Sequence, residues 1–143
     1  MSAPRLVSPL SISASGMAAE RFRMEIIASN LANAHTTRTS SGQPFRRQDV
    51  VIESVGSPSR VGPEGAMGVR VVEVVEDTSP FQRVYSPSHP DADAEGYVSY
   101  PNVQLPVEMV NLLTAMRSYE ANLKAAQAYR QISEQALILL RGV

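Results

Sequence analysis

Apolar residues recur at helical spacing near the start of the chain. Alternating steps of four and three residues give seven positions, of which six are apolar. They are Leu10, Ala14, Met17, Arg21, Met24, Ala28 and Leu31. This spacing is typical of a coiled-coil seam, and Ile27 widens the apolar stripe. Because Ser8 or Ser11 can cap the N-terminus of a helix, the pattern predicts a helix that begins there and ends near Ala34.

A second and longer seam lies near the end of the chain. Steps of three and four residues give ten positions, of which eight are apolar. They are Met109, Leu112, Met116, Tyr119, Leu123, Ala126, Arg130, Ser133, Leu137 and Leu140. The pattern predicts a helix from Pro106 to about Arg141, with Gly142 where a helix stop belongs. A helix of this length exceeds the usual globular range and is typical of a coiled coil or an intersubunit helix.

The residues between the two seams have the character of strands. Val50–Val55 and Val69–Val75 are short runs rich in β-branched residues, and a Gly- and Pro-rich stretch, 56–68, separates them. This order predicts a β-hairpin with a long, mobile loop. Phe81–Tyr85 is a candidate third strand, and the prolines between 80 and 101 indicate an extended connector.

We therefore expect a mainly α fold with a small β-rich insertion. Residues 1–36 form the N-terminal helical part, residues 37–105 the hairpin-containing middle segment and connector, and residues 106–143 the C-terminal helix. The two long terminal helices pair as a coiled coil. Each is apolar on one side, and a helix pair beside so small a middle segment leaves apolar surface uncovered. The sequence therefore predicts partners that cover this surface.

Composition and charge exclude several classes of function. The chain has 143 residues, enough for one ordinary domain, and a formal net charge of −1, so no basic excess points to nucleic acid. It has no cysteine, which excludes disulfides, thiolate metal sites and a cysteine nucleophile. No stretch approaches the ~18 apolar residues of a membrane span, and none near the N-terminus forms the apolar region of a signal peptide. We expect no membrane insertion and, if the protein is exported, a route that cleaves no leader.

Candidate chemistry is sparse. Asp91, Asp93 and Glu95 fall at the first, third and fifth positions of a calcium-binding loop, but the twelfth position is Asn102 instead of the bidentate Glu that the geometry requires. We interpret this segment as an acidic turn. The two histidines form no helical i, i+4 pair, and neither a nucleophile elbow nor a phosphate loop is present. We therefore expect no catalytic residue, metal, cofactor or small-molecule substrate.

Two asparagines, Asn30 and Asn33, stand three residues apart near the end of the first helix, where asparagine is a poor helix former. One interpretation is that they terminate the helix. The other is that their side-chain amides donate hydrogen bonds to the backbone of a neighbouring subunit. The spacing alone does not separate the two.

Two segments carry a resemblance to a known family. Ala28–Ala34, followed by Thr36, resembles the N-terminal signature of the flagellar axial proteins, which include rod, hook and hook-associated subunits. Met116–Asn122 resembles the C-terminal signature of the same proteins, in which an aromatic residue, an acid, Ala and Asn recur in the terminal helix. His35–Arg38 departs from the continuation that many relatives have after the threonine.

Three further segments narrow the resemblance within this family. Val84–Asp91, Gly96–Val103 and Glu108–Asn111 are similar to the proximal-rod subunits of the basal body. The resemblance implies a structural subunit that self-assembles through its terminal helices into a helical tube that transmits torque. It also implies a periplasmic rod location, export through the flagellar type III apparatus, and contacts with copies of itself and with other rod proteins.

The seams and the two signatures together assign the expected assembly contacts. They are Leu10, Met17, Met24, Ile27, Asn30, Leu31, Asn33, Met109, Leu112, Met116, Tyr119, Glu120, Asn122, Leu123, Leu137 and Leu140. Two other interpretations remain open. One is a coiled-coil adaptor that binds a helical partner in solution, and the other is a different flagellar axial subunit of the rod or hook type.

Overall fold

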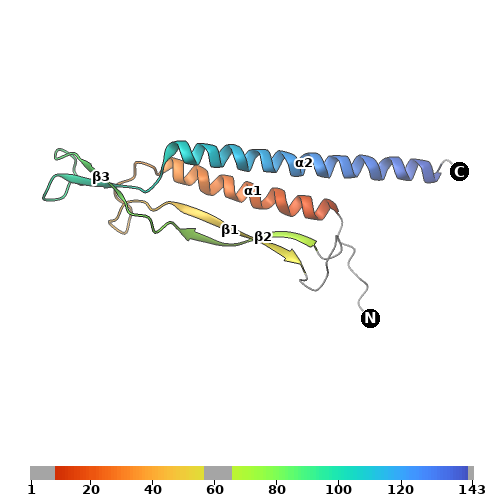
Figure 1. The fold of residues 1–143 in the computed structure, drawn as a ribbon, viewed down its shortest axis with the longest axis horizontal. Coiled ribbons are helices and arrows are strands. Elements are labelled where there is room, and N and C mark those ends of the chain that lie inside the picture. Colours follow the sequence, from red (N-terminus) through yellow and green to blue (C-terminus); the bar gives the residue numbers. More distant parts are fainter. Residues whose placement is uncertain (1–8, 57–65, 142–143) are drawn as a thin grey trace. The chain divides into compact units, whose positions relative to one another are not determined.

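The computed structural model describes residues 9–56 and 66–141 and contains two helices and four strands in that part of the chain (Figure 1). In chain order they are α1 (Pro9–Ala32), β1 (Gln48–Gly56), β2 (Ala66–Glu76), β3 (Gln82–Tyr85), β4 (Tyr97–Tyr100) and α2 (Leu105–Arg141). The predicted order of a helix, a β-rich middle and a second helix is confirmed. Three of the predicted features lie outside the described residues: the Ser8 cap, the mobile loop within 57–65 and the Gly142 stop.

The strands form two separate two-stranded sheets. β1 is hydrogen-bonded to β2, as the hairpin prediction requires, and β3 is hydrogen-bonded to β4. The second pair is antiparallel, with Gln82 opposite Tyr100 and Tyr85 opposite Tyr97. β3 confirms the candidate third strand, but β4 was expected to be part of an extended connector. None of the described helices is long and apolar enough to cross a membrane.

A tight turn explains why β4 pairs with β3. Gly96 has a φ of 84°, which a residue with a Cβ rarely adopts, and an added Cβ would lie 2.9 Å from the Tyr85 ring. The Asp93 carboxylate accepts the backbone N–H groups of Glu95 at 3.0 Å and Tyr97 at 2.9 Å. The chain is thereby reversed just before the first residue of β4.

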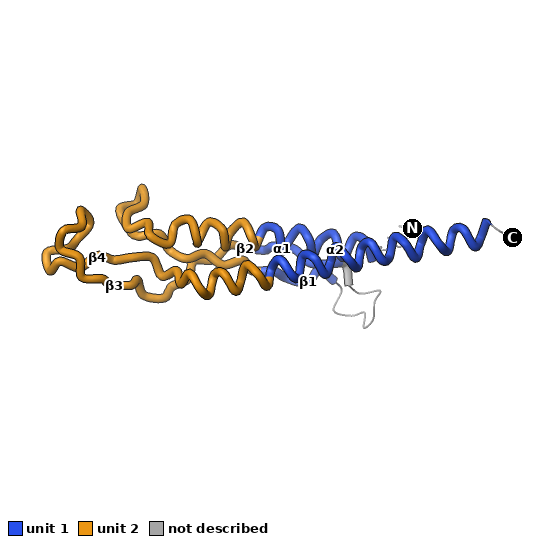
Figure 2. Tube along the Cα trace, turned by 90° about the horizontal axis from the view of Figure 1, so that it is seen from above, with its two compact units in different colours: residues 1–22, 52–72, 115–143 blue, residues 23–51, 73–114 orange. Residues whose placement is uncertain are grey.

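The chain divides into two compact units, each of which takes part of both helices (Figure 2). Unit 1 comprises residues 1–22, 52–72 and 115–143, and unit 2 comprises residues 23–51 and 73–114. Each helix therefore contributes one portion to unit 1 and the other to unit 2.

The core of unit 2 combines apolar and polar residues. Its buried apolar side chains come from the end of α1, from β4 and from the segment before α2: Ile27, Ala34, Val98 and Val103. Buried beside them are three polar residues, Asn30, Asn102 and Glu108. Unit 2 thus has a mixed interior in which the polar groups need hydrogen-bond partners.

Among the described residues of unit 1, the buried apolar side chains are all alanines: Ala19, Ala115 and Ala126. The helices approach closely here, because a Cβ added to Gly16 would lie 2.9 Å from the Asn122 side chain. β2 also lies close to α1: Gly68 adopts a φ of 112°, and a Cβ there would collide with Ser15. Unit 1 therefore buries small side chains.

The buried positions of the helices differ from the predicted seams. In α1 they are Ala19, Ile27 and Asn30, whereas the seam residue Leu10 is exposed. In α2 the seam residue Ala126 is buried, but the larger seam residues are exposed or half-buried. Coiled-coil pairing of the two helices along the predicted seams is therefore not confirmed.

Candidate assembly site

The first turn of α2 contains a carboxylate that is completely buried. Glu108 Oε1 accepts a hydrogen bond from Arg47 Nε at 2.7 Å, and Glu108 Oε2 accepts one from Asn30 Nδ2 at 3.1 Å. The Arg47 side chain is itself only 17% exposed. A buried charge without a partner is strongly unfavourable, so these two contacts offset the burial of the Glu108 carboxylate.

Asn30 joins this carboxylate to the start of β1. Its Nδ2 donates to the Gln48 carbonyl oxygen at 2.8 Å, and its Oδ1 accepts the Gln48 N–H at 2.9 Å. The side chain thus pairs with the backbone of Gln48 as a neighbouring strand would. Because both amide atoms bond within the chain and the residue is fully buried, the expected bonds to a neighbouring subunit do not describe Asn30.

Asn102 completes the group, which we call the polar cluster: Asn30, Arg47, Asn102 and Glu108. Asn102 Oδ1 accepts the Arg47 N–H at 2.9 Å, and Nδ2 donates to the carbonyl oxygens of Asp77 at 3.0 Å and Ser79 at 3.3 Å. The polar cluster therefore links α1, β1, the end of β2 and α2 within unit 2.

Electrostatics keep Arg47 charged in this setting. Burial alone would lower the pKa of Arg47, but the hydrogen bond and charge of Glu108, together with those of Asp49, outweigh burial and raise it. Arg47 Nη1 lies 3.2 Å from an Asp49 carboxylate oxygen and 3.6 Å from one of Asp77. The polar cluster is therefore an ion pair of Arg47 and Glu108 that is flanked by the side-chain amides of Asn30 and Asn102.

The second asparagine, Asn33, acts at the helix end. Its Nδ2 donates to the Ser29 carbonyl oxygen at 2.9 Å, and its Oδ1 accepts a hydrogen bond from the Thr36 hydroxyl at 3.2 Å. The first contact reaches a backbone carbonyl in the last turn of α1, where carbonyls lose their helical partners, and the second joins two side chains just beyond the helix. This geometry agrees with the helix-termination interpretation of the Asn33 side chain.

Each carboxylate of the acidic turn has a cationic partner. Asp91 accepts hydrogen bonds from Thr37 at 2.8 Å and Arg38 at 2.7 Å, and Asp93 is paired with Arg83 at 2.7 Å. Within residues 9–56 and 66–141, no group of three or more acidic or histidine side chains is placed to hold a metal ion.

The structure distributes the predicted assembly residues over three environments. Exposed are Leu10, Met109, Met116, Glu120, Leu123, Leu137 and Leu140. Half-buried are Met17, Met24, Leu31, Asn33, Leu112, Tyr119 and Asn122, and buried are Ile27 and Asn30. Five of the seven large apolar seam residues of α2 are thus exposed, in contrast to the small buried residues Ala115 and Ala126.

Sequence reasoning did not identify the polar cluster as a unit. Glu108 had entered only as part of a short segment resembling rod proteins, and Asn102 only as the residue that fails to complete a calcium loop. No pattern in the sequence had drawn attention to Arg47. A buried ion pair between residues 61 positions apart leaves no periodic signal, although a glutamate in the first turn of a helix is electrostatically favoured.

Comparison with known proteins identifies the class. The family described as "Flagella basal body rod protein" matches residues 10–38, and the family described as "Flagellar basal body rod FlgEFG protein C-terminal" matches residues 94–139. The two matches coincide with the two terminal signatures and include most of α1 and α2.

Full-length relatives narrow the class further. Flagellar basal-body rod protein FlgC of Bacillus subtilis is 43% identical over 140 residues, covering 90% of this chain and 93% of the relative. The proteins of the same name from Aquifex aeolicus and Salmonella typhimurium are 44% and 38% identical, covering 91% and 94% of this chain and 93% and 97% of the relatives. The chain belongs to the family of flagellar basal-body rod protein FlgC, a family of structural rod subunits rather than enzymes.

Proposed function

We propose that this chain is a proximal-rod subunit that polymerises through the exposed apolar residues of its terminal helices. The product is a helical tube in the basal body that transmits torque. Supporting this proposal is the exposure of most large apolar seam residues of α2, while the buried apolar positions of this helix are the alanines Ala115 and Ala126. Met109 is 60% exposed and Leu123 is 38% exposed, whereas Ala115 is fully buried.

The exposed apolar side chains of α2 are not buried by any other part of the described chain. Fully burying a side chain such as Leu or Met contributes roughly 1.5–3 kcal/mol, and a soluble monomer rarely exposes large contiguous apolar patches. We propose that the seams on α1 and α2 form coiled-coil contacts with helices of neighbouring subunits. In this scheme the alanine-lined contacts of unit 1 hold the two helices of one subunit together.

The proposal names copies of the same chain and other rod proteins as partners. It also includes export through the flagellar type III apparatus without cleavage of a leader, and a periplasmic location in the rod. These statements rest on the family to which the chain belongs.

Isolation of basal bodies from cells that produce the tagged subunit tests the proposed function. We expect the subunit to remain with the rod after the membrane rings are removed, and its deletion to abolish motility. Mass spectrometry of its N-terminal peptide is expected to match the unprocessed sequence. A soluble, monodisperse heterodimer with a helical partner, and no subunit in basal bodies, would instead indicate the adaptor function.

A further inference from the structure

A carboxylate oxygen in the unit 1 part of α1 has no hydrogen-bond partner. Within residues 9–56 and 66–141, Glu20 Oε2 is the one buried side-chain nitrogen or oxygen atom that lacks a partner. A buried acceptor that is left unpaired costs free energy, and such a group in a native protein requires an explanation. The residue as a whole is only half-buried, so a donor from outside the chain can approach its carboxylate.

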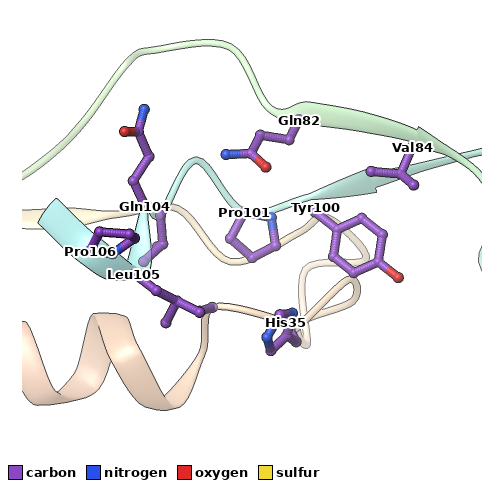
Figure 3. Close-up of a pocket in the computed structure, with 10 residues that line it drawn as sticks. His35, Gln82, Val84, Tyr100, Pro101, Gln104, Leu105 and Pro106 are labelled. Atoms are coloured by element: carbon purple, nitrogen blue, oxygen red, sulfur yellow. The ribbon is translucent and has the colours of Figure 1, made fainter. Parts of the chain in front are cut away.

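The pocket of unit 2 differs from Glu20 in this respect. It has a volume of about 560 Å³ and lies where the segment after α1, the β3–β4 sheet and the start of α2 meet (Figure 3). The polar side chains in its lining are His35, Gln82, Tyr100 and Gln104. None of these four has a buried atom without a partner. The pocket therefore does not require a partner, whereas the Glu20 carboxylate does.

Glu20 belongs to a largely apolar stripe of α1. Steps of three and four residues that pass through it give seven positions, of which five are apolar: Leu10, Ser13, Met17, Glu20, Met24, Ile27 and Leu31. All but Leu10 are buried or half-buried, whereas Ala14, Arg21 and Ala28 beside the stripe are exposed. In coiled coils a single polar residue in such a stripe fixes the register and the partner at a cost in stability. Glu20 has both the position and the unpaired atom of such a residue.

The end of α2 carries a matching seam with a charge of opposite sign. Its seven positions are Tyr119, Leu123, Ala126, Arg130, Ser133, Leu137 and Leu140. Taken in the opposite direction, their spacing equals that of the α1 stripe at every step, and Arg130 is the one charged residue among them. Two seams of this kind fit together again after each shift of seven residues. Pairing of Glu20 with Arg130 selects one of these registers.

The Arg130 side chain is able to bind a second carboxylate. It is 78% exposed, and its Nε donates a hydrogen bond to Glu134 at 3.0 Å. Such exposed pairs on one helix contribute little to stability. Because a guanidinium has five N–H donors and this hydrogen bond uses the one on Nε, the donors on the two Nη atoms can serve another acceptor.

Glu20 does not reach Arg130 of its own chain. Within unit 1 the two helices run in opposite directions (Figure 1), and Gly16 lies against Asn122. Glu20, one helical turn beyond Gly16, therefore lies near the level of Ser118. Arg130 lies about 18 Å further along α2, because a helix rises about 1.5 Å per residue. The partner of Glu20 must therefore come from another copy.

We propose that Glu20 of one copy of this chain pairs with Arg130 of a second copy and thereby fixes the register of an antiparallel contact between α1 and α2. The inference rests on the proposed function and specifies one contact within the polymer. In this register Ile27 lies opposite Leu123 of the second copy. Because α1 and α2 contribute different surfaces, each copy can use both at once, as a polymer requires.

Exchange of the two charges tests this pair in the full chain. We expect Glu20→Arg alone or Arg130→Glu alone to lower the amount of subunit in basal bodies at least about tenfold, because like charges then meet. Chains with both substitutions are expected to return to within about twofold of the parent, since the two changes are coupled. Circular dichroism of each isolated variant checks that it folds.

A neutral exchange covers the case in which Glu20→Arg does not fold. Glu20→Gln and Arg130→Gln each leave one charged partner alone, so we expect each to incorporate poorly. The double Gln variant leaves no charge unpaired and is expected to incorporate better than either single one.

Two controls use the same helix. Glu134→Gln removes the intrahelical partner of Arg130 and is expected to incorporate like the parent. Lys124→Glu, at an exposed position outside the seam, is not expected to restore Glu20→Arg. A folded Arg130→Glu subunit present at the parental amount, or folded single variants that neither exchange restores, excludes the pair while the proposed function stands. If even the parent is absent from basal bodies, the proposed function fails and the pair fails with it.

Discussion

Two glutamates of α2 each form an ion pair with an arginine, but the two pairs have different surroundings. Glu108 pairs with Arg47 at 2.7 Å and is buried, whereas Glu134 pairs with Arg130 at 3.0 Å on the surface. Exposed ion pairs contribute little to stability, but removing one member of a buried pair leaves an uncompensated charge. At the scale of single residues, burial therefore decides which of the two ion pairs contributes substantially to the stability of the fold.

Replacement of Glu108 by Gln is expected to destabilise the subunit by about 3 kcal/mol, the lower end of the range for a broken buried pair. Arg47 keeps its contact with Asp49 at 3.2 Å, which limits the loss. Glu134→Gln on the same helix is the matched control, with an expected loss of less than about 1 kcal/mol. Urea unfolding of both variants measures the difference. Equal losses would show that the polar cluster does not stabilise unit 2.

The acidic turn is expected to lose order in acid. The backbone N–H of Tyr97 and the Arg83 side chain hold the pKa of Asp93 below its ordinary value of 3.8. Because the folded pKa is lower than the unfolded one, this contribution to stability is present above pH 3.8 and disappears as the pH falls through the folded pKa.

Amide exchange of Tyr97, followed by NMR as the pH is lowered, measures this loss. We expect faster opening of the turn once corrected for intrinsic exchange, and a weaker pH dependence in Asp93→Asn. A Tyr97 amide whose protection does not change through that range would contradict the assignment.

The roles of individual residues were the hardest feature of the molecule to predict from the sequence. Seam spacing located the large apolar residues of α2, but it could not tell whether they face the chain's own interior or a partner. Asn30 shows the same limitation, because its two bonds to Gln48 depend on a contact 18 residues away in the sequence. Such roles follow from tertiary packing, which periodicity does not encode.

At the scale of elements, each helix has two portions with different interiors. The portions in unit 2 enclose Ile27, Val98 and the polar cluster, whereas the buried apolar side chains described in unit 1 are alanines. Burial of apolar area is the main favourable term in folding. We infer that unit 2 is stable in the isolated subunit and that unit 1 gains much of its stability from neighbours.

Hydrogen exchange on the isolated subunit tests this difference within each helix. We expect slower exchange for amides of 24–32 and 109–114 than for amides of 13–22 and 115–141, because local stability follows the buried contacts around each portion. Glu108→Gln is expected to accelerate exchange in the first group selectively. Uniform protection along both helices in the isolated subunit would contradict the inference.

The elements themselves were largely predictable. Both helices have the expected bounds to within two or three residues at the ends that the structure describes, since caps and apolar spacing are local signals. β4 was missed because Tyr97–Tyr100 is short and lies among prolines. Its pairing with β3 depends on the Gly96 turn and on the Asp93 carboxylate, two features that a propensity-based reading of the connector does not weigh.

At the scale of the whole molecule, the exposed large apolar residues of α2 are the feature on which the proposed assembly rests. According to the proposed function, neighbouring subunits cover these residues in the polymer. This is the central claim of the account, and Leu123 tests it because it is partly exposed in the isolated chain and lies on the predicted seam.

The most direct measurement is the amount of Leu123→Asp subunit in purified basal bodies. In the isolated subunit the new carboxylate can reach water, because Leu123 is 38% exposed, so we expect the variant to fold. In the rod the substitution removes the burial of the exposed part of the side chain, about 1 kcal/mol per copy, and adds the cost of desolvating a carboxylate. We therefore expect a folded, exported subunit that is absent from basal bodies, in cells that do not swim. Lys124→Asp, one residue along the same helix, is the control and should incorporate. Basal bodies with a full complement of Leu123→Asp subunit, from cells that swim normally, would contradict assembly through the exposed apolar residues of α2.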